Sequence, residues 1–108
     1  MNPQIQEILD TVPISALATA NSDGVPWSTP IHFSHDEQFL YWFSATNTEH
    51  SRNIEENHLV SLTIWSPDES NGLVGVYLQS QAVESGDRQS AEDTYLAKFG
   101  EVPESFSP

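Results

Sequence analysis

The chain has 108 residues and a formal net charge of −13 at pH 7, from 3 Lys and Arg against 16 Asp and Glu. This length gives one domain with one hydrophobic core, and the negative charge disfavours binding to nucleic acid or to anionic lipid surfaces. The absence of cysteine excludes disulfides, thiolate nucleophiles and cysteine-ligated metal centres, so any chemistry comes from oxygen atoms, imidazoles or a cofactor.

Residues 1–13 predict a short helix. Asn2 followed by Pro3 is typical of a helix start, because an oxygen cap precedes a residue whose fixed φ suits the first turn. The segment lacks the basic flank and apolar stretch of a signal peptide, and no part of the chain has the apolar length of a membrane span. We therefore expect a cytoplasmic protein without a membrane anchor. The apolar residues of this helix share one face: Ile5, Ile8, Leu9 and Val12.

Two strands joined by a tight turn are expected next. Residues 14–20 and residues 25–33 have the composition of paired strands. Between them, Asp23-Gly24 supplies the positive φ that a hairpin turn needs. The returning strand holds two prolines that cannot donate ladder hydrogen bonds, which favours an edge strand or a strand that faces a ligand: Pro26 and Pro30.

The middle of the chain predicts a second hairpin and a second helix. Polar residues 34–38 lead into an apolar strand over residues 39–45. Thr46 and Glu49 have the spacing of a capping box, which predicts a short and mostly solvated helix that ends near Asn57.

The last part of the chain predicts a strand over residues 59–65, a polar loop over 66–72, a long strand over 73–83 and a helix over 90–99 that ends at Gly100. Adjacent hairpins imply antiparallel order, because the connections are too short for parallel crossovers. We therefore expect a mostly β fold, a small antiparallel barrel with short flanking helices. The core of such a barrel is filled by its own side chains, so a ligand lies outside it or at a subunit interface.

Several common catalytic motifs are missing. The 5 glycines form neither a Walker A loop nor a dinucleotide-binding fingerprint, and no serine lies in a Gly-x-Ser-x-Gly elbow. His32 and His35 are three residues apart outside a helix, which is weak support for a metal site, so we expect no bound metal. The sequence therefore argues against nucleotide hydrolysis by these routes, against a serine hydrolase and against metal catalysis.

One group of polar residues stands out around the start of the second predicted helix. Hydroxyls, an imidazole and a guanidinium gather where helix N–H groups point outward, which is the chemistry that binds a phosphate monoester. An ordinary helix cap with polar neighbours explains the same pattern, and both interpretations stay open. The strand over 25–33 contributes Ser28, Thr29, Pro30, Ile31 and His32, and its hairpin partner ends in Ser44. The helix start contributes Thr46, Thr48, His50, Ser51 and Arg52.

In these segments the chain resembles the pyridoxamine 5′-phosphate oxidase-like family of FMN-binding split-barrel proteins. The resemblance covers about residues 5–85 and depends on the order and spacing of short segments, none of which is diagnostic alone. The segments are LAT at 17–19, DGVP at 23–26, STPIHF at 28–33, LYWFS at 40–44, His50 seven residues before Asn57, and VSLTI at 60–64.

The resemblance implies a six-stranded split barrel that works as a homodimer, with FMN in a groove between the subunits. The single domain would span residues 1–108, with a helix over 1–13, the barrel over 14–85, and a C-terminal helix and tail over 87–108. The strand segment 29–32 would run along the flavin ring, and the start of the second helix would hold the flavin phosphate. The cofactor-binding residues implied in this way are Thr29, Pro30, Ile31, His32, Ser44, Thr48, His50, Ser51 and Arg52.

The chain departs from the family at cationic positions. Thr29 stands where pyridoxamine oxidases have Arg, and Glu49-His50 replaces their Arg-Lys pair, while Val74 replaces a Gln at the flavin edge. Loss of two charge-assisted hydrogen bonds of about 1.5–3 kcal/mol each weakens phosphate binding by about 100-fold or more. Oxidation of pyridoxamine phosphate itself is therefore not expected.

The resemblance predicts a flavin-dependent oxidoreductase of unknown substrate. FMN would pass hydride or electrons between a reduced nicotinamide cofactor and a small-molecule substrate. Two alternatives stay open, because a shared fold does not fix function. One is a dimeric binding module that has lost tight FMN binding, and the other is a haem- or deazaflavin-binding relative on the same scaffold.

Overall fold

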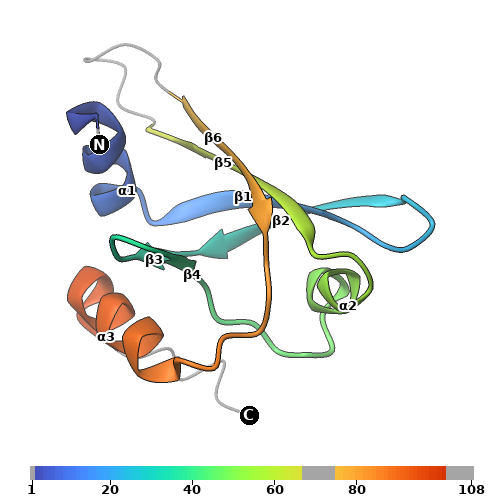
Figure 1. The fold of residues 1–108 in the computed structure, drawn as a ribbon. Helices are drawn as coiled ribbons and strands as arrows, with labels where there is room; N and C mark the ends of the chain where they lie inside the picture. The colour runs from blue at the N-terminus through green and yellow to red at the C-terminus, as the bar shows by residue number, and fades with distance from the viewer. Residues whose placement is uncertain (1, 67–74, 102–108) are drawn as a thin grey trace.

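A computed structural model describes residues 2–66 and 75–101, which fold into three helices and six strands (Figure 1). None of these helices has the length and apolar character needed to cross a lipid bilayer. In chain order the elements are α1 (Pro3–Thr11), β1 (Ile14–Ala20), β2 (Pro26–His32), β3 (Ser34–His35), β4 (Leu40–Tyr41), α2 (Glu49–Glu56), β5 (Leu59–Trp65), β6 (Gly75–Gln81) and α3 (Arg88–Phe99).

The strands form two sheets. Four of them pair in the order β2-β1-β5-β6, and β3 pairs with β4 in a separate hairpin. All of these pairings are antiparallel, which confirms the predicted mostly β, antiparallel fold with flanking helices. In the described residues the strands do not close into one six-stranded barrel, because β3 and β4 are only two residues long and pair with each other alone.

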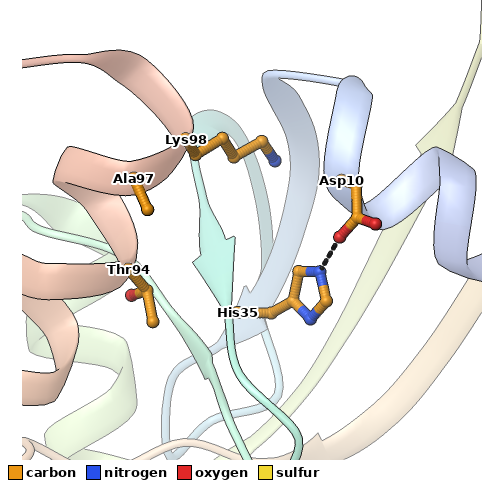
Figure 2. Close-up of a pocket in the computed structure, with 5 residues that line it drawn as sticks. All are labelled: Asp10, His35, Thr94, Ala97 and Lys98. Carbon is orange, nitrogen blue, oxygen red and sulfur yellow. Dashed lines mark hydrogen bonds and ion pairs between the residues drawn. The ribbon is translucent and has the colours of Figure 1, made fainter.

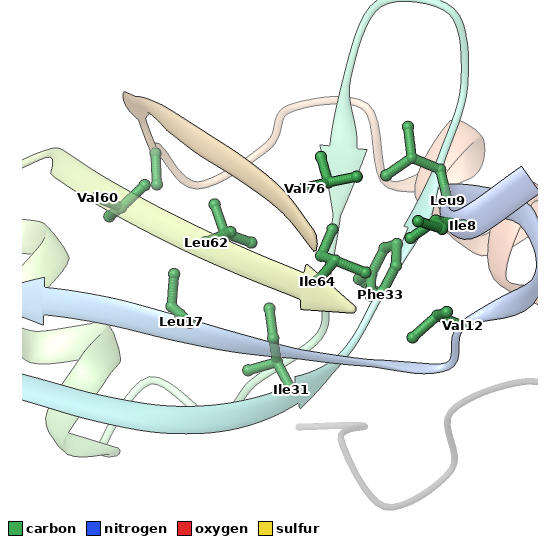
Figure 3. Packing of buried hydrophobic residues seen from close by; sticks show 11 residues of the cluster. Ile8, Leu9, Val12, Leu17, Ile31, Phe33, Val60, Leu62, Ile64 and Val76 are labelled. Atoms are coloured by element: carbon green, nitrogen blue, oxygen red, sulfur yellow. The ribbon is translucent and has the colours of Figure 1, made fainter. Parts of the chain in front are cut away.

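The four-stranded sheet has two different faces. The register pairs Leu17 with Thr29 on one side and with Leu62 on the other, so these side chains lie on the same face, which we call the inner face. The buried core lies against this inner face and includes residues of α1 (Figure 3). Burial of each large side chain stabilises the fold by about 1.5–3 kcal/mol. The core residues are Ile8, Leu9, Val12, Leu17, Ile31, Phe33, Val60, Leu62, Ile64, Val76 and Ala82.

The first helix and the first hairpin confirm the sequence prediction. Asn2 caps α1, where its side chain accepts a hydrogen bond from the Gln4 N–H at 2.8 Å. In the β1–β2 turn Gly24 has a φ of 80°, a conformation that costs other residues energy. The Asn21 side chain accepts hydrogen bonds from the N–H groups of Asp23 and Val25, which fixes the turn.

The structure corrects two helix starts. The cap of α2 is Thr48, whose hydroxyl accepts a hydrogen bond from the Ser51 N–H at 3.2 Å, and not Thr46. The helix α3 begins at Arg88, two residues before the predicted start, because the Asp87 carboxylate accepts from the N–H of the residue three positions later. Both ends are as predicted, since Asn57 follows α2 and a left-handed Gly100 follows α3.

The second hairpin is also different from the prediction. The strand predicted over residues 39–45 is limited to β4, and the predicted connection over 34–38 contains β3. A side chain explains the tight turn, because Asp36 accepts hydrogen bonds from the N–H groups of Gln38 and Phe39 and from the Tyr41 hydroxyl. The predicted strand over 59–65 is confirmed as β5. Residues 67–74 lie outside the described residues, so the predicted loop over 66–72 and the start of the strand over 73–83 are not tested.

Candidate functional site

Four of the predicted phosphate-binding residues lie together at the start of α2. His50 Nε2 lies 2.7 Å from Ser44 Oγ and 3.4 Å from Thr48 Oγ1. Thr48 Oγ1 in turn lies 2.8 Å from Ser51 Oγ. We call these four side chains the polar cluster. The Ser51 N–H already donates to Thr48 Oγ1, and the N–H groups of Glu49 and His50 at the start of the helix have no acceptor within the helix.

His50 is the least exposed member of the polar cluster. Its side chain and backbone together are 8% exposed. Burial lowers the pKa of His50 below its ordinary value of 6.5, because the charged imidazolium loses hydration. At neutral pH the imidazole is therefore uncharged. Its Nε2 atom contacts the hydroxyls of Ser44 and Thr48, and the ring supplies no positive charge.

Arg52 does not reach the polar cluster. Its guanidinium donates a hydrogen bond of 3.0 Å to the carboxylate of Glu49, and both side chains are substantially exposed. An exposed pair three residues apart on a helix contributes little to stability, so the guanidinium is free to exchange partners at small cost. In this arrangement Arg52 lies one turn along α2 from the helix start.

The strand segment 29–32 lies on two faces of the sheet. Thr29 and Ile31 point to the inner face, where Ile31 belongs to the hydrophobic core, while Pro30 and His32 point to the opposite, outer face. In the described residues no hydrogen bond joins this segment's side chains to the polar cluster. The predicted site residues therefore form two groups, and only the group at the start of α2 is held together by its own contacts.

Four aromatic rings connect these two groups. The Phe43 ring meets Tyr95 edge to face at 5.7 Å, Tyr95 lies 4.5 Å from Phe99, and Phe99 lies 5.5 Å from His32, all between ring centroids. Because Phe43 precedes Ser44 in the chain, α3 links the polar cluster to the end of β2. One feature of the sequence points to this contact, namely the spacing of Tyr95 and Phe99 by one helical turn.

A buried hydrogen bond fixes α2 on the sheet. The Asn53 side-chain amide donates a hydrogen bond of 3.1 Å to Thr19 Oγ1 on β1, and both residues are less than 5% exposed. The bond joins residues 34 positions apart in the chain. Sequence reasoning did not find this pair, because Asn53 looks like one more polar residue of a solvated helix.

The outer face of the four-stranded sheet is broad and uncharged. Every second residue of the four strands points to this face, and none of these described residues is Asp, Glu, Lys or Arg. Four large side chains on it are markedly exposed: Tyr77 at 78%, Leu59 at 64%, Trp65 at 47% and Ile14 at 45%. The outer-face residues are Ile14, Ala16, Ala18, Ala20, Pro26, Ser28, Pro30, His32, Leu59, Ser61, Thr63, Trp65, Gly75, Tyr77, Gln79 and Gln81.

A hollow of about 570 Å³ lies on one end of this outer face. Its volume falls in the range of small-molecule sites, which is about 300–1,000 Å³. We call it the outer-face hollow. Its lining residues come from β1, β5, β6 and the end of α2: Ala18, Thr19, Ala20, Asn57, Leu59, Val60, Ser61, Gln79, Ser80 and Gln81.

A second, smaller hollow of about 280 Å³ lies between α1, β3 and α3 (Figure 2). Figure 2 shows His35 of β3 bonded to Asp10 of α1, with Lys98 of α3 directed toward the same helix. His35 Nε2 lies 2.8 Å from Asp10 Oδ1, and its Nδ1 lies 3.2 Å from the carbonyl oxygen of Asp36. His35 is therefore held at the end of β3 by two contacts, and its side chain is largely buried.

The fold is that of a small antiparallel β protein with short flanking helices, and the polar cluster lies at the start of α2. The chain belongs to the pyridoxamine 5′-phosphate oxidase family, whose sequence pattern matches residues 1–107. This match confirms the resemblance found in the sequence and extends it over nearly the whole chain. Comparison with curated proteins gives no match.

Several solved structures have a similar fold. HutZ, the haem storage protein from Vibrio cholerae, is similar with a TM-score of 0.76 and 20% identity over 93% of this chain and 76% of HutZ. A haem-binding protein from Mycobacterium smegmatis is similar with a TM-score of 0.73 and 19% identity, and the match covers 86% of this chain and 40% of that protein. An F420 reductase is similar with a TM-score of 0.67 and 21% identity, and the match covers 83% of this chain and 75% of the reductase. At these identities the likeness establishes the fold alone.

Proposed function

We propose that this chain is an FMN-binding flavoprotein, a homodimeric oxidoreductase that transfers hydride or electrons between a reduced nicotinamide cofactor and a small-molecule substrate. In this proposal residues 1–108 form one split-barrel domain that acts in the cytoplasm, and the barrel is completed beyond the four-stranded sheet by the β3–β4 hairpin. The observation that carries the proposal is the polar cluster at the start of α2.

The polar cluster suits a phosphate in its donor chemistry. Ser44, Thr48 and Ser51 each offer a hydroxyl, and the adjacent helix N-terminus offers N–H groups and a favourable dipole. His50 adds a ring nitrogen that gains a charge-assisted hydrogen bond once it is protonated. Arg52 adds a charged donor if it leaves Glu49, an exposed partner that holds it weakly.

The rest of the chain supplies orientation rather than chemistry. A bound FMN would supply the redox chemistry, because its ring accepts and donates hydride or single electrons. Pro30 and His32 present the end of β2 on the outer face, where a flavin ring would meet the strand. The contact between His32 and Phe99 fixes that strand end against α3.

The outer face supports the homodimer. None of the described outer-face residues is Asp, Glu, Lys or Arg, so two copies that meet on this face bring no like charges into direct contact, although each chain has a net charge of −13. The exposed rings of Tyr77 and Trp65 are of the kind enriched in interfaces. Because the face carries both Pro30 and the outer-face hollow, a second copy would turn the hollow into a groove between subunits.

A haem-binding function is the second candidate. The similarity in fold to HutZ and to the Mycobacterium smegmatis haem-binding protein favours it, and the similarity to an F420 reductase favours a deazaflavin in the same way. The missing cations at Thr29 and His50 favour a third candidate, a binding module without tight FMN binding. All of these candidate functions are compatible with the same fold, so they are distinguished by which cofactor the protein binds.

The test is an absorbance spectrum of the purified protein before and after incubation with FMN, with haem and with F420. We expect a flavin spectrum at about one FMN per subunit, by analogy with the fold. His50→Lys should tighten FMN binding by about tenfold or more, since it adds a charge-assisted hydrogen bond, and His50→Ala should weaken it. His58→Lys is the matched control, because His58 is exposed and lies beyond the end of α2.

The proposal fails if the protein takes up no FMN. A Soret band after incubation with haem, without flavin binding, would instead establish the haem-binding candidate. If His50→Lys and His58→Lys change the affinity for FMN equally, the FMN phosphate does not bind at the polar cluster.

A further inference from the structure

His35 joins two parts of the fold through both nitrogens of its ring. Its Nε2 lies 2.8 Å from Asp10 Oδ1 on α1, and its Nδ1 lies 3.2 Å from the carbonyl oxygen of Asp36 in the β3–β4 turn. Figure 2 shows the contact with the Asp10 carboxylate as a dashed line. The His35 side chain is 13% exposed, so water does not easily replace either partner. We call these two contacts the His35 link.

Both partners of the His35 ring can only accept a hydrogen bond. A carbonyl oxygen has no hydrogen to donate. Asp10 is ionised near neutral pH, because hydrogen bonds from Gln6 and His35 lower the pKa of its carboxyl group. The link is therefore complete only when each ring nitrogen carries a hydrogen. The imidazolium form has hydrogens on both nitrogens, whereas each neutral tautomer has one.

The charged groups that face His35 come from three elements. Asp10 lies on α1, and the carboxylate of Asp36 lies in the turn, where hydrogen bonds from backbone N–H groups and a hydroxyl hold its pKa below the usual value. Lys98 on α3 lines the same hollow as His35. Two carboxylates and one ammonium therefore surround the ring, and this balance is compatible with a positive charge on it.

The hairpin that contains His35 is very short. Its ladder has two residue pairs, Ser34 with Tyr41 and His35 with Leu40. Because an isolated two-stranded hairpin is at most marginally stable in water, side-chain contacts are needed to hold this one in place. Ser34 Oγ lies 2.8 Å from Thr94 Oγ1 on α3, and the His35 link supplies a contact with α1.

We propose that His35 is a pH-dependent switch of the β3–β4 hairpin: its imidazolium form ties the hairpin to α1, and the hairpin loosens when the ring loses one proton. A carboxylate is a stronger acceptor than a carbonyl, so the neutral ring keeps its hydrogen on Nε2, toward Asp10. The contact between Nδ1 and the Asp36 carbonyl then opens, and the contact with Asp10 is no longer one between two charged groups. Histidines change charge between about pH 5 and 8, so the hairpin is held more weakly as the pH rises through this range.

The first test follows the His35 ring by ¹⁵N NMR in the full chain without added FMN. We expect hydrogens on both nitrogens at about pH 5.5 and loss of the Nδ1 hydrogen as the pH rises. The titration ends at about pH 7.5, because burial lowers the pKa of Lys98 to about 8. A ring that carries one hydrogen over the whole range, or one that keeps both, would overturn the inference.

The second test measures amide hydrogen exchange of the hairpin over the same pH range. The rates are expressed as protection factors, so the base catalysis of exchange cancels. The reporters are the Asp36 N–H, which donates to the carbonyl oxygen of Phe39, and the Phe39 N–H, which donates to Asp36 Oδ1. Because hydrogen bonds between charged groups are the stronger ones, we expect protection to fall about fivefold from pH 5.5 to 7.5. Constant protection would contradict the switch.

Asp10→Asn separates the switch from general effects of pH. A side-chain amide donates to a neutral Nε2 while Nδ1–H donates to the Asp36 carbonyl, so the link is then complete without the second ring proton. We expect the pH dependence of protection to disappear in this variant. Glu7→Gln is the matched control, because it makes the same charge change at an exposed position of the same helix, and it should keep the pH dependence.

Equal behaviour of the two variants would mean that the Asp10 carboxylate is not the partner, and the inference would fail. If Asp10→Asn does not fold, the ¹⁵N measurement on the natural chain still tests the switch. No cofactor takes part in these experiments. A failed switch therefore leaves the flavoprotein proposal unchanged, and a chain that takes up no FMN leaves the switch unchanged.

Discussion

Lys98 Nζ on α3 donates a hydrogen bond of 2.7 Å to the carbonyl oxygen of Val12, just beyond the end of α1. It donates a second of 3.0 Å to the carbonyl oxygen of Leu9 and lies 3.5 Å from the centroid of the Phe33 ring. The carbonyl groups at a helix C-terminus carry partial negative charge, so an ammonium is well placed there. One lysine thus holds α3 against both α1 and the end of the first hairpin.

The first prediction concerns Lys98 and alkaline pH. Burial lowers the pKa of Lys98 from 10.5 to about 8, with Asp10 opposing the shift. Between these pH values the unfolded chain binds more protons than the folded chain, so the free energy of unfolding rises as the pH rises from about 8 to 10.5. We expect a rise of about 1–2 kcal/mol, below the full linkage value because the side chain is partly exposed. Urea unfolding at several pH values measures it.

Lys98→Met should remove this rise. The readout is the slope of the free energy of unfolding against pH, since the absolute stability also changes when the two hydrogen bonds are lost. Lys98→Arg is the matched control, because its guanidinium stays charged throughout this range and also gives no rise. An unchanged slope in both variants would mean that Lys98 is not the group responsible for the alkaline rise.

The second prediction concerns His50 and mildly acidic pH. Burial lowers the pKa of His50 below the value of 6.5 that it has in the unfolded chain. As the pH falls below 6.5 the unfolded chain therefore takes up the proton first, and stability falls with it. We expect His50→Asn to flatten this loss between pH 7 and 5, as measured by thermal unfolding.

His58→Asn is the control for this experiment. His58 is exposed, so its replacement should leave the acid dependence as it is in the natural chain. If His58→Asn and His50→Asn flatten the curve equally, the buried imidazole is not the group responsible.

The third prediction concerns the hydrogen bond between Asn53 and Thr19. Asn53→Ala leaves the buried Thr19 hydroxyl without its partner, which should destabilise the protein by about 1–3 kcal/mol. Thr19→Val removes the hydroxyl and keeps the volume. In a double-mutant cycle we expect a coupling of about 1 kcal/mol between the two changes, measured by urea unfolding. If the two changes in the free energy of unfolding are strictly additive, the hydrogen bond between the two side chains does not contribute to stability.

The sequence predicts the local elements well where a single residue type determines the backbone. Gly24 and Gly100 both have positive φ, and each marks a turn or a helix end that the sequence placed correctly. The alternation in β1 and β5 likewise places both strands, because every second side chain faces the core. Such features depend on neighbours in the chain, which are visible in the sequence.

Features that depend on distant residues are not visible in this way. Thr46 and Thr48 are both suitable caps of α2 by residue type, and the structure has Thr48 in that position. His35 meets Asp10 across 25 positions, and Lys98 meets Val12 across 86. The sequence places the polar cluster correctly around the start of α2, since its members lie within a few residues. It does not show that His50 is buried.

The uncharged outer face was likewise hidden, because it combines every second residue of four strands and becomes visible only when their register is known. Alanines on β1, hydroxyls on β5 and glutamines on β6 each look unremarkable within their own strand. The absence of charge on their shared face is a property of the sheet.

The fourth prediction tests this face as the surface on which two copies meet. Thr63 pairs with Ala16 on one side and with Tyr77 on the other, so it lies near the centre of the outer face. Thr63→Glu places a carboxylate of each copy against an uncharged surface, and burial of an unpaired charge is strongly unfavourable. We expect a dimer in the natural chain and a monomer in the variant, as measured by analytical ultracentrifugation. Gln38→Glu, an equal charge change in the exposed β3–β4 turn, should leave the dimer intact. A monomeric natural chain, or a Thr63→Glu variant that stays dimeric, would exclude this face as the interface. If a monomer still binds FMN, the cofactor does not need a groove between two subunits.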